Sequence, residues 1–337
     1  MARTFEQQHL GPVGTVTQQQ HRRGHPERRS LARTIPDRNR AGLCISRHRV
    51  VLIDRVPPTL TPTPDITPVT DTKLRAMPDH DAQPQRTSPF TRCLLAPNAG
   101  PMTLDGTNSY IIAAPGSTDI VVVDPGPLDD GHLAALAAVG RVTLVLVTHR
   151  HADHTAASAR FAKLTGAPVR AFDPTYCLGG DPLAAGELIE AAGTSIHIVH
   201  TPGHTDDSVC LHLPNDGPTG SVLTGDTILG RGTSIIDGTL ADYLASLESL
   251  RALGPAIVLP AHGPVLPDLA ASCDAYLAHR RERLEQVRAS LRELGEDASA
   301  AQVTDLVYAQ TDAAVRFAAE ASVRAQLAYL RGGSGAS

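Results

Sequence analysis

The sequence feature that most constrains the fold is the segment THRHADH at residues 148–154, which directly follows a short apolar run. That run predicts a buried strand. Alternate side chains of an extended chain share a face, so His149, His151 and Asp153 start out pointing the same way. His154 joins them once the backbone turns into the helix expected next. Imidazoles and carboxylates bind zinc, iron and manganese, and four such groups exceed what one tetrahedral ion with an open position needs. The segment therefore indicates two metals.

Three more ligand-type residues come just after β-type runs further along the chain. The run IHIVH and the turn TPG lead to His204, the run VLTG leads to Asp226, and the run IVLPA leads to His262. For a single H-x-H motif, a polar surface loop with coincidental histidines would be the better interpretation. Four strand ends that each deliver metal ligands argue against coincidence and predict one shared metal site.

The rest of the chain from about residue 90 predicts a layered α/β domain, because short β-type runs alternate with helical stretches. After residue 264 the strand runs stop. Residues 269–294 read as one long helix, with Arg280, Arg281, Glu282, Arg283 and Glu285 expected on its solvent side. Two further helices are expected at 299–308 and 313–330, the first with Ser299 as its N-cap.

The first 88 residues differ from the remainder in charge and pattern. Residues 1–90 hold 14 arginines and lysines against 8 acidic residues, whereas the remainder holds 16 against 27. The Gln-, Arg- and Thr/Pro-rich patches show no sustained period, so this part cannot bury enough apolar surface to offset its chain entropy. We expect residues 1–88 to be a disordered extension. A basic tail that holds RNA and upstream sequence translated from a misplaced start are the alternatives.

Overall charge and cysteine content favour a cytoplasmic protein. The net charge of −5 gives no global positive field for nucleic acid or a membrane surface. The five cysteines are odd in number and widely spaced, with no C-x-x-C pair, which fits a reducing compartment. No apolar stretch approaches the roughly 20 residues of a membrane span, and no signal-peptide core is present. Nothing in the sequence indicates an oligomeric state.

Four motifs resemble those of the metallo-β-lactamase superfamily: H-x-H-x-D-H at 149–154, P-G-H-T at 202–205, G-D-T at 225–227 and A-H-G-P at 261–264. The resemblance implies an αββα sandwich with the metals at the edge where the two sheets meet. It also implies the division of the ligands: His149, His151 and His204 on one ion, Asp153, His154 and His262 on the other, and Asp226 bridging both. Asp124, in the segment VDPG, matches the family's acidic residue beneath the site, where it would orient a ligand histidine. A plain turn-forming Asp before Pro-Gly is the alternative.

The segment TLDGTNSY at 103–110 and the A-H-G-P motif leading into a helical end are similar to the β-lactamase-like-2 branch of that superfamily. The branch implies a hydrolase domain, here 89–265, and a small helical winged-helix-like C-terminal domain, here 266–337. It includes an endoribonuclease specific for single-stranded RNA. For such a substrate the candidate contacts are Asn108, Arg231, Arg280 and Arg281, and Arg150 inside the H-x-H-x-D-H motif is a further cation. For each of these arginines a solvated surface side chain is the favoured alternative.

The expected chemistry is zinc-dependent hydrolysis by a dinuclear centre, with iron or manganese as alternative metals. Two ions that share a metal-bound hydroxide have a nucleophile near neutral pH. Asp153 is the candidate catalytic residue that orients the attacking water or accepts its proton. Single-stranded RNA is the leading specific substrate, and a small thioester or ester, as for glyoxalase II, comes second. A non-enzymatic metal-bound interaction protein is the third interpretation, disfavoured by the intact set of seven ligands.

Overall fold

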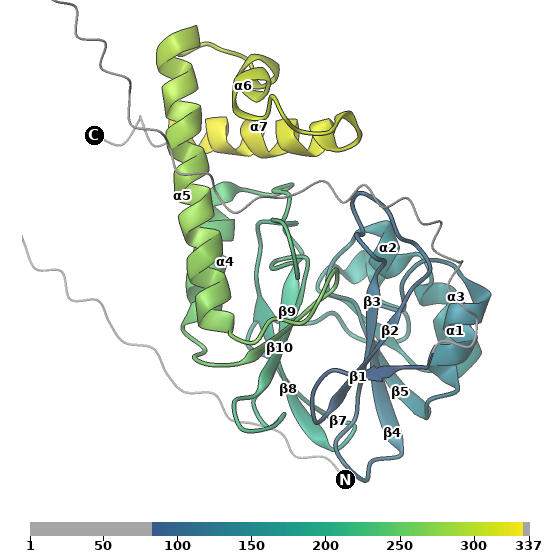
Figure 1. Cartoon of the computed structure of the whole chain (residues 1–337). Helices are drawn as coiled ribbons and strands as arrows, with labels where there is room; N and C mark the ends of the chain where they lie inside the picture. The colour runs from purple at the N-terminus through teal and green to yellow at the C-terminus, as the bar shows by residue number, and fades with distance from the viewer. Residues whose placement is uncertain (1–82, 333–337) are drawn as a thin grey trace, which may run out of the picture. The chain divides into compact units, whose positions relative to one another are not determined.

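The computed structural model describes residues 83–332, which belong to one unit of the chain, residues 72–337 (Figure 1). Its first sheet contains six strands that lie side by side in chain order. The strands are β1 (Gln85–Arg86), β2 (Thr91–Leu95), β3 (Asn108–Ile112), β4 (Asp119–Val123), β5 (Arg141–Leu146) and β6 (Val169–Arg170). Strands β1 to β4 pair antiparallel, and β4, β5 and β6 pair parallel.

The second sheet contains five strands in the order β11-β10-β9-β8-β7. They are β7 (Leu188–Ala191), β8 (Thr194–His200), β9 (Val209–Leu213), β10 (Ser221–Gly225) and β11 (Ile257–Pro260). Only β10 and β11 pair parallel, because the helix α4 (Leu240–Arg251) connects them as a crossover. The other neighbouring pairs are antiparallel.

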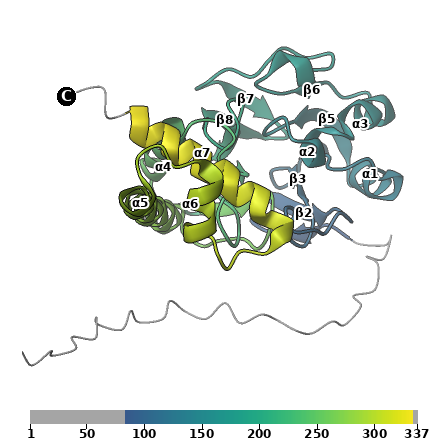
Figure 2. The same cartoon turned by 90° about the horizontal axis from the view of Figure 1, so that it is seen from above.

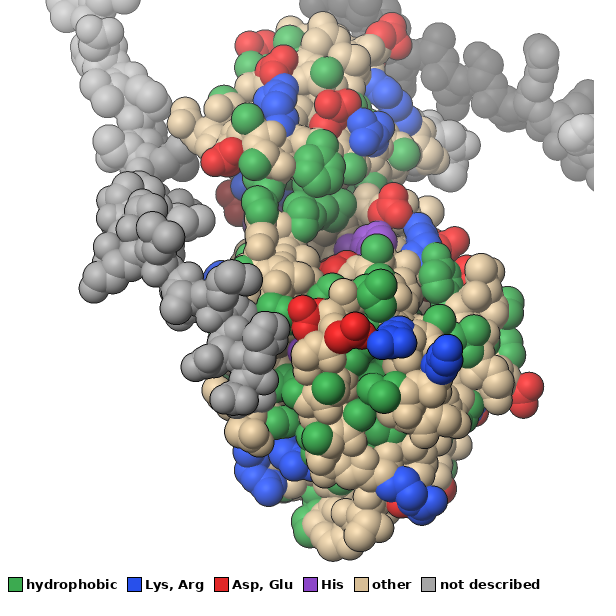
Figure 3. Space-filling model, turned by 90° about the vertical axis from the view of Figure 1, so that its right-hand side faces the viewer, with side chains coloured by type: hydrophobic (Ala, Val, Ile, Leu, Met, Phe, Trp, Pro, Cys, Tyr) green, Lys and Arg blue, Asp and Glu red, His purple; other side chains and the backbone are tan. Residues whose placement is uncertain are grey.

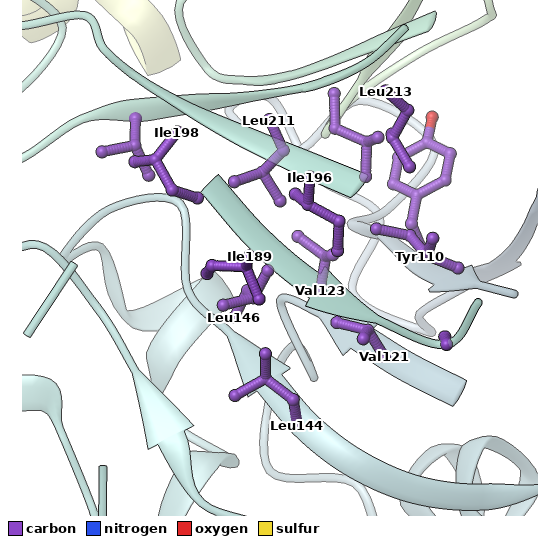
Figure 4. Close-up of a cluster of buried hydrophobic side chains, with 14 of the residues drawn as sticks. Tyr110, Val121, Val123, Leu144, Leu146, Ile189, Ile196, Ile198, Leu211 and Leu213 are labelled. Atoms are coloured by element: carbon purple, nitrogen blue, oxygen red, sulfur yellow. The ribbon is translucent and has the colours of Figure 1, made fainter. Parts of the chain in front are cut away.

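The two sheets pack face to face around one core (Figure 4). Successive side chains of β4 alternate between the faces of its sheet. Val121 and Val123 point into the core between the sheets, while Ile120 and Val122 belong to the cluster on the outer face. Ile196 and Leu211 enter the same core from the second sheet. This alternation of apolar residues on both faces shows that each sheet is also covered on its outer side.

Helices cover both outer faces, which gives the four-layer αββα sandwich that the family resemblance implied (Figure 2). The helices α1 (Asp130–Ala137) and α3 (Ser158–Thr165) cover the first sheet through Leu133, Leu136 and Phe161. The helix α4 and the first half of α5 (Leu269–Leu294) cover the second sheet. Short helical turns at α2 (Ala152–Thr155) and η1 (Pro174–Tyr176) complete this part.

The C-terminal helices are α5, α6 (Ala300–Val307) and α7 (Arg316–Gly332), with the 3-10 turn η2 (Ala313–Val315) before the last. Ser299 caps α6 in a capping box with Gln302, so the predicted N-cap is confirmed. The second half of α5 packs with α6 and α7 around a separate small cluster that includes Val287 and Val323. The helical prediction is confirmed, but within residues 261–332 no named strand follows β11, so this region contains no wing hairpin.

The ordered sheet begins earlier than the expected boundary at residue 89. Gln85–Arg86 form the edge strand β1, and Ser88 donates to the buried carboxylate of Asp216 at 2.5 Å. The backbone N–H of Phe90 donates to the other oxygen of Asp216 at 2.7 Å. Residues 83–88 therefore belong to the fold, and the prediction for residues 1–82 lies outside the described part of the chain. Among residues 83–332, no helix combines the length and apolarity that crossing a membrane requires.

Candidate metal centre

The seven predicted ligands follow the C-terminal ends of β5, β8, β10 and β11, on loops and, for Asp153 and His154, in the short helix α2. The ends of β5 and β10, which belong to different sheets, meet where Gly225 lies against Thr148. A Cβ atom on Gly225 would be 2.9 Å from the Cβ of Thr148, and the φ of Gly225 is +49°. Only glycine tolerates both conditions without strain. This close approach puts Asp226 beside the H-x-H-x-D-H loop.

Three histidine nitrogens face one another in the first ligand group. The Nε2 atoms of His149 and His204 are 3.2 Å apart, and each is 3.1 Å from Nδ1 of His151. The Oδ2 atom of Asp226 is 3.6 Å from His204 Nε2. Together these four residues form the first ligand group.

The second ligand group consists of Asp153, His154 and His262. Asp153 Oδ2 is 3.2 Å from His154 Nε2 and 3.1 Å from His262 Nε2. The other oxygen of Asp226, Oδ1, is 3.3 Å from His262 Nε2 and 3.8 Å from His154 Nε2. Asp226 thus has one oxygen toward each group, as a bridging carboxylate requires.

The outer nitrogens of the histidines show why a cation fits between them. His149 Nδ1 lies 3.0 Å from Thr148 Oγ1, and His204 Nδ1 donates to the carbonyl oxygen of Ile235 at 2.9 Å. A neutral imidazole has one N–H, so the inward-facing nitrogens of these two rings carry lone pairs. Lone pairs that converge on one point repel one another unless a cation lies between them.

The distances within the groups match a tetrahedral metal. Ligands about 2.0–2.1 Å from zinc are separated from one another by roughly 3.3 Å. Ligand atoms in both groups are 3.1 to 3.3 Å apart, which is close to this ligand–ligand distance. Moreover, His154 Nε2 and Asp226 Oδ1 are buried without a hydrogen-bond partner. Buried polar atoms are rarely left unsatisfied, so these two atoms are further signs of a ligand site. The residues fit a dinuclear metal centre.

The two groups differ in their proton affinities. Burial lowers the pKa of His149 below its ordinary value and lowers the pKa of His204 to about 4. Burial acts in the same direction on His154, but the carboxylates of Asp124 and Asp153 outweigh it and raise the pKa of His154. The three histidines of the first group are therefore neutral, whereas His154 in the second group is paired with carboxylates. In the second group a metal ion would take the place of a proton.

Asp124 lies beneath the site and holds the loop of the second group. Its Oδ2 accepts from His154 Nδ1 at 2.8 Å and from Thr148 Oγ1 at 2.7 Å, and its Oδ1 accepts from the backbone N–H of Thr148. The φ of Asp124 is +50°, which is uncommon for a residue other than glycine. A carboxylate on the outer nitrogen fixes the orientation of a ligand imidazole. The alternative of a plain turn residue does not account for these contacts.

The candidate substrate contacts have partners within the protein. The side-chain amide of Asn108 donates to the backbone carbonyls of Pro260 and Gly263, so it holds the loop of His262. Arg231 pairs with Asp105 at 2.8 Å, and Arg281 lies 3.8 Å from Glu248 on the outer surface.

Arg280, expected on the solvent side of its helix, is instead 2% exposed. It shares the buried stripe of α5 with Cys273, Leu277 and Leu284, at the three- and four-residue spacing of a helix face. The prediction for Arg280 is therefore wrong.

Several supporting groups could not be predicted because they are backbone atoms. His262 Nδ1 lies 3.1 Å from the carbonyl oxygen of Gly106, and His204 Nδ1 donates to that of Ile235. Any residue type supplies a carbonyl, so these positions carry no side-chain signal. Ser234, whose Oγ is 3.0 Å from His204 Nδ1, was missed because nothing marks it in sequence.

Comparison with known proteins agrees with this geometry. Residues 102–262 match the model of the metallo-beta-lactamase superfamily. A beta-lactamase-like protein 2 homolog of Caenorhabditis elegans is 30% identical over 251 residues, which cover 70% of this chain and 82% of that protein. An atrochrysone carboxyl ACP thioesterase of Aspergillus fumigatus is 28% identical, with 68% of this chain and 55% of that protein covered.

Among solved structures, a beta-lactamase domain protein from Burkholderia ambifaria superimposes with a TM-score of 0.62 at 22% sequence identity. The match covers 79% of this chain and 91% of that one. Fold, ligand set and relatives agree. The chain belongs to the metallo-beta-lactamase superfamily and is a metal-dependent hydrolase.

Proposed function

We propose that the chain uses two zinc ions to hydrolyse a small carboxylic ester or thioester. The observation that carries this choice of substrate is the neutralisation or burial of the arginines that RNA would need. Sequence alone placed single-stranded RNA first, and the contacts of those arginines reverse the order.

Zinc is the metal proposed because both groups consist of imidazole and carboxylate at tetrahedral spacing. When bound, two such ions lower the pKa of a shared water and polarise the carbonyl oxygen of a substrate. The chain itself supplies orientation. Asp124 and the carbonyl of Ile235 hold two of the imidazoles, so the ligands need little rearrangement.

Asp153 is the residue proposed to accept the proton of the attacking water. Its side chain is 27% exposed, whereas those of the ligand residues His154 and His262 are 0% and 1% exposed. Burial opposes its ionisation, but His154 and His262 outweigh that effect and hold the pKa of Asp153 below its ordinary value. The carboxylate is therefore ionised and open to the cleft.

A polyanion would meet little free positive charge at the site. Arg150, inside the H-x-H-x-D-H motif, donates to Asp206, Asp207 and Asp237. Arg231 is paired with Asp105. RNA affinity depends on cations that replace the counterions of phosphates, and cations already paired with carboxylates supply little of this. A neutral ester or thioester needs no unpaired cations for binding.

The surroundings of the site also suit an acyl group. Figure 3 shows histidine side chains at the bottom of a recess, with hydrophobic side chains above them. Ligand pockets are mostly apolar with a few polar groups that fix orientation. One of the similar proteins is named a thioesterase, although the chain spans only 55% of its length.

The test is a side-by-side assay of the purified full chain with a short acyl thioester, a chromogenic carboxylic ester and a single-stranded RNA oligonucleotide. Zinc content is measured by elemental analysis, and each assay is repeated after chelation and after zinc is restored. Asp153→Asn serves as the variant that keeps the shape of the site.

We expect two zinc ions per chain and zinc-dependent hydrolysis of the ester or thioester, reduced about 100-fold or more in Asp153→Asn. RNA cleavage with a higher kcat/KM than either small substrate, and lost in the same variant, would overturn the proposed substrate. A fully active protein with one ion or none would overturn the dinuclear centre.

A further inference from the structure

The buried arginine of α5 needs a structural explanation. Arg280 is 2% exposed and is among the largest fully buried side chains of the described residues. Removing a guanidinium from water costs several kcal/mol unless other groups compensate. None of the ion pairs found between residues 83 and 332 joins Arg280 to a carboxylate at up to 4.0 Å. Arg280 is therefore held by other contacts.

Those contacts join α5 to the 227–239 loop, which connects Asp226 to α4. Nη2 of Arg280 donates to the backbone carbonyl of Ser234. Its guanidinium lies over the ring of Tyr243, 5.0 Å from the ring centroid. The hydroxyl of Tyr243 donates in turn to the carbonyl of Thr227 at 2.6 Å. Tyr243 thus holds the start of the loop that follows Asp226, and Arg280 holds its middle.

The same loop holds one metal ligand. His204 Nδ1 donates to the carbonyl of Ile235 at 2.9 Å and lies 3.0 Å from Ser234 Oγ. The backbone N–H of Asp237 donates to the carbonyl of His204 at 2.9 Å. Ser234 is therefore contacted by Arg280 on one side and by His204 on the other. The carbonyl that Arg280 holds belongs to Ser234, and the next carbonyl along the chain, that of Ile235, accepts from His204.

We propose that Arg280 is a positioning residue for His204, through which the C-terminal helices set the affinity of the first ligand group for its metal. The second group does not depend on Arg280 in this way. The loop reaches it through Gly230, whose N–H donates to the carbonyl of His262, and that part of the loop is held by Tyr276, whose hydroxyl accepts from the N–H of Leu229. His154 is held by Asp124, and His262 by the carbonyl of Gly106. Loss of Arg280 weakens one of the two metal sites and leaves the other.

The test measures metal binding, with no substrate present. The metal-free full chain is titrated with zinc in competition with a chromogenic chelator, which resolves two binding steps. Arg280→Met keeps the length and apolar stem of the side chain but removes its donors and its charge. Arg281→Met is the matched control. Arg281 is the next residue of the same helix, but its side chain is 69% exposed and lies 3.8 Å from Glu248.

We expect Arg280→Met to weaken one step about 10- to 100-fold, the range for partners that orient a metal ligand. The zinc affinity of the other step changes less than about threefold. Arg281→Met has the same zinc affinities as the parent protein in both steps. Two unchanged steps in Arg280→Met, or two steps weakened alike, would overturn the proposal. If Arg280→Met does not fold, Arg280→Lys is used, since it keeps a cation beside Tyr243 but not the planar donor geometry. The same selective loss, smaller in size, is then expected.

The proposal rests on the two-metal centre of the proposed function but not on its substrate. If neither small substrate is hydrolysed while the selective loss is observed, the substrate assignment fails and the positioning role stands. If hydrolysis is observed while both steps weaken alike, the positioning role fails by itself.

Discussion

At the scale of single residues, Asp226 is the only one of the seven ligands with an oxygen toward each ligand group. We expect Asp226→Ala to weaken both zinc sites, at least 10- to 100-fold each, because both ions lose a ligand. His204→Ala should weaken chiefly the first. Elemental analysis after dialysis distinguishes the two: fewer than one ion in Asp226→Ala against about one in His204→Ala. Near-normal zinc content in Asp226→Ala would show that the carboxylate does not bridge.

His132, on α1, makes a prediction about acid stability. Burial lowers its pKa to about 4, and the nearby Asp129 opposes that only in part. The folded pKa lies below the unfolded value of about 6.5, so the unfolded state binds more protons between these pH values. The stability that this neutral imidazole contributes is complete above pH 6.5 and is lost as the pH falls toward 4.

His132→Gln should therefore lose less stability on acidification than the parent protein. Between pH 6.5 and 5 the difference should be about 2 kcal/mol, since one pH unit corresponds to about 1.4 kcal/mol per proton. Urea unfolding of both metal-free proteins at the two pH values measures it, and the contributions of the ligand histidines cancel. If both proteins lose the same free energy of unfolding between pH 6.5 and pH 5, His132 is not neutral in the folded protein.

The seven ligand-type side chains that the structure brings together could be singled out in the sequence because each is suited to metal and follows an apolar run. Prediction failed at Arg280 because a cluster of charged residues predicts a solvent face. The spacing from Cys273 through Leu277 to Leu284 already placed position 280 on the buried stripe. Helical period would have been the better guide than charge at this position.

At the scale of elements, the predicted bounds were best where a cap marks them. The helix at 269–294 was predicted with the bounds that α5 has, and its N-cap Asp268 accepts from the backbone N–H of Ala271. Strands without a clear local pattern could not be predicted in this way. In β2 the sequence TRCLL lacks clear alternation, and its place is set by pairing with β3. Such long-range pairing is invisible in a local pattern.

The edge of the first sheet makes a prediction about truncation. A chain that starts at Gln83 keeps β1 and Ser88, whereas a chain that starts at Pro89 loses both. Asp216 is 0% exposed, so it would lose one of its donors without water to replace it. The shorter chain should be less stable by about 1–3 kcal/mol, which thermal unfolding measures. Equal melting temperatures of the two truncated chains would show that β1 contributes nothing.

At the scale of the whole molecule, the metal centre joins the two sheets at one edge, so its occupancy should affect global stability. A ligand at 1,000 times its Kd stabilises the folded state by about 4 kcal/mol. Two sites occupied in this way should raise the Tm by more than about 10 °C over the metal-free protein. Calorimetry with and without chelator measures the shift, and Asp226→Ala should reduce it. No shift in the parent protein would mean that the ligands are not joined by metal.

The order of the ligands along the chain has a consequence for biosynthesis. His149 and its neighbours leave the ribosome long before His262, the last ligand of the set, and His204 and Asp226 lie between them. A nascent chain that ends before β11 has all four residues of the first ligand group but lacks His262 of the second. Full affinity arises only when the second sheet closes against the first. We therefore expect the second site to be completed last, when His262 joins the hydrolase domain.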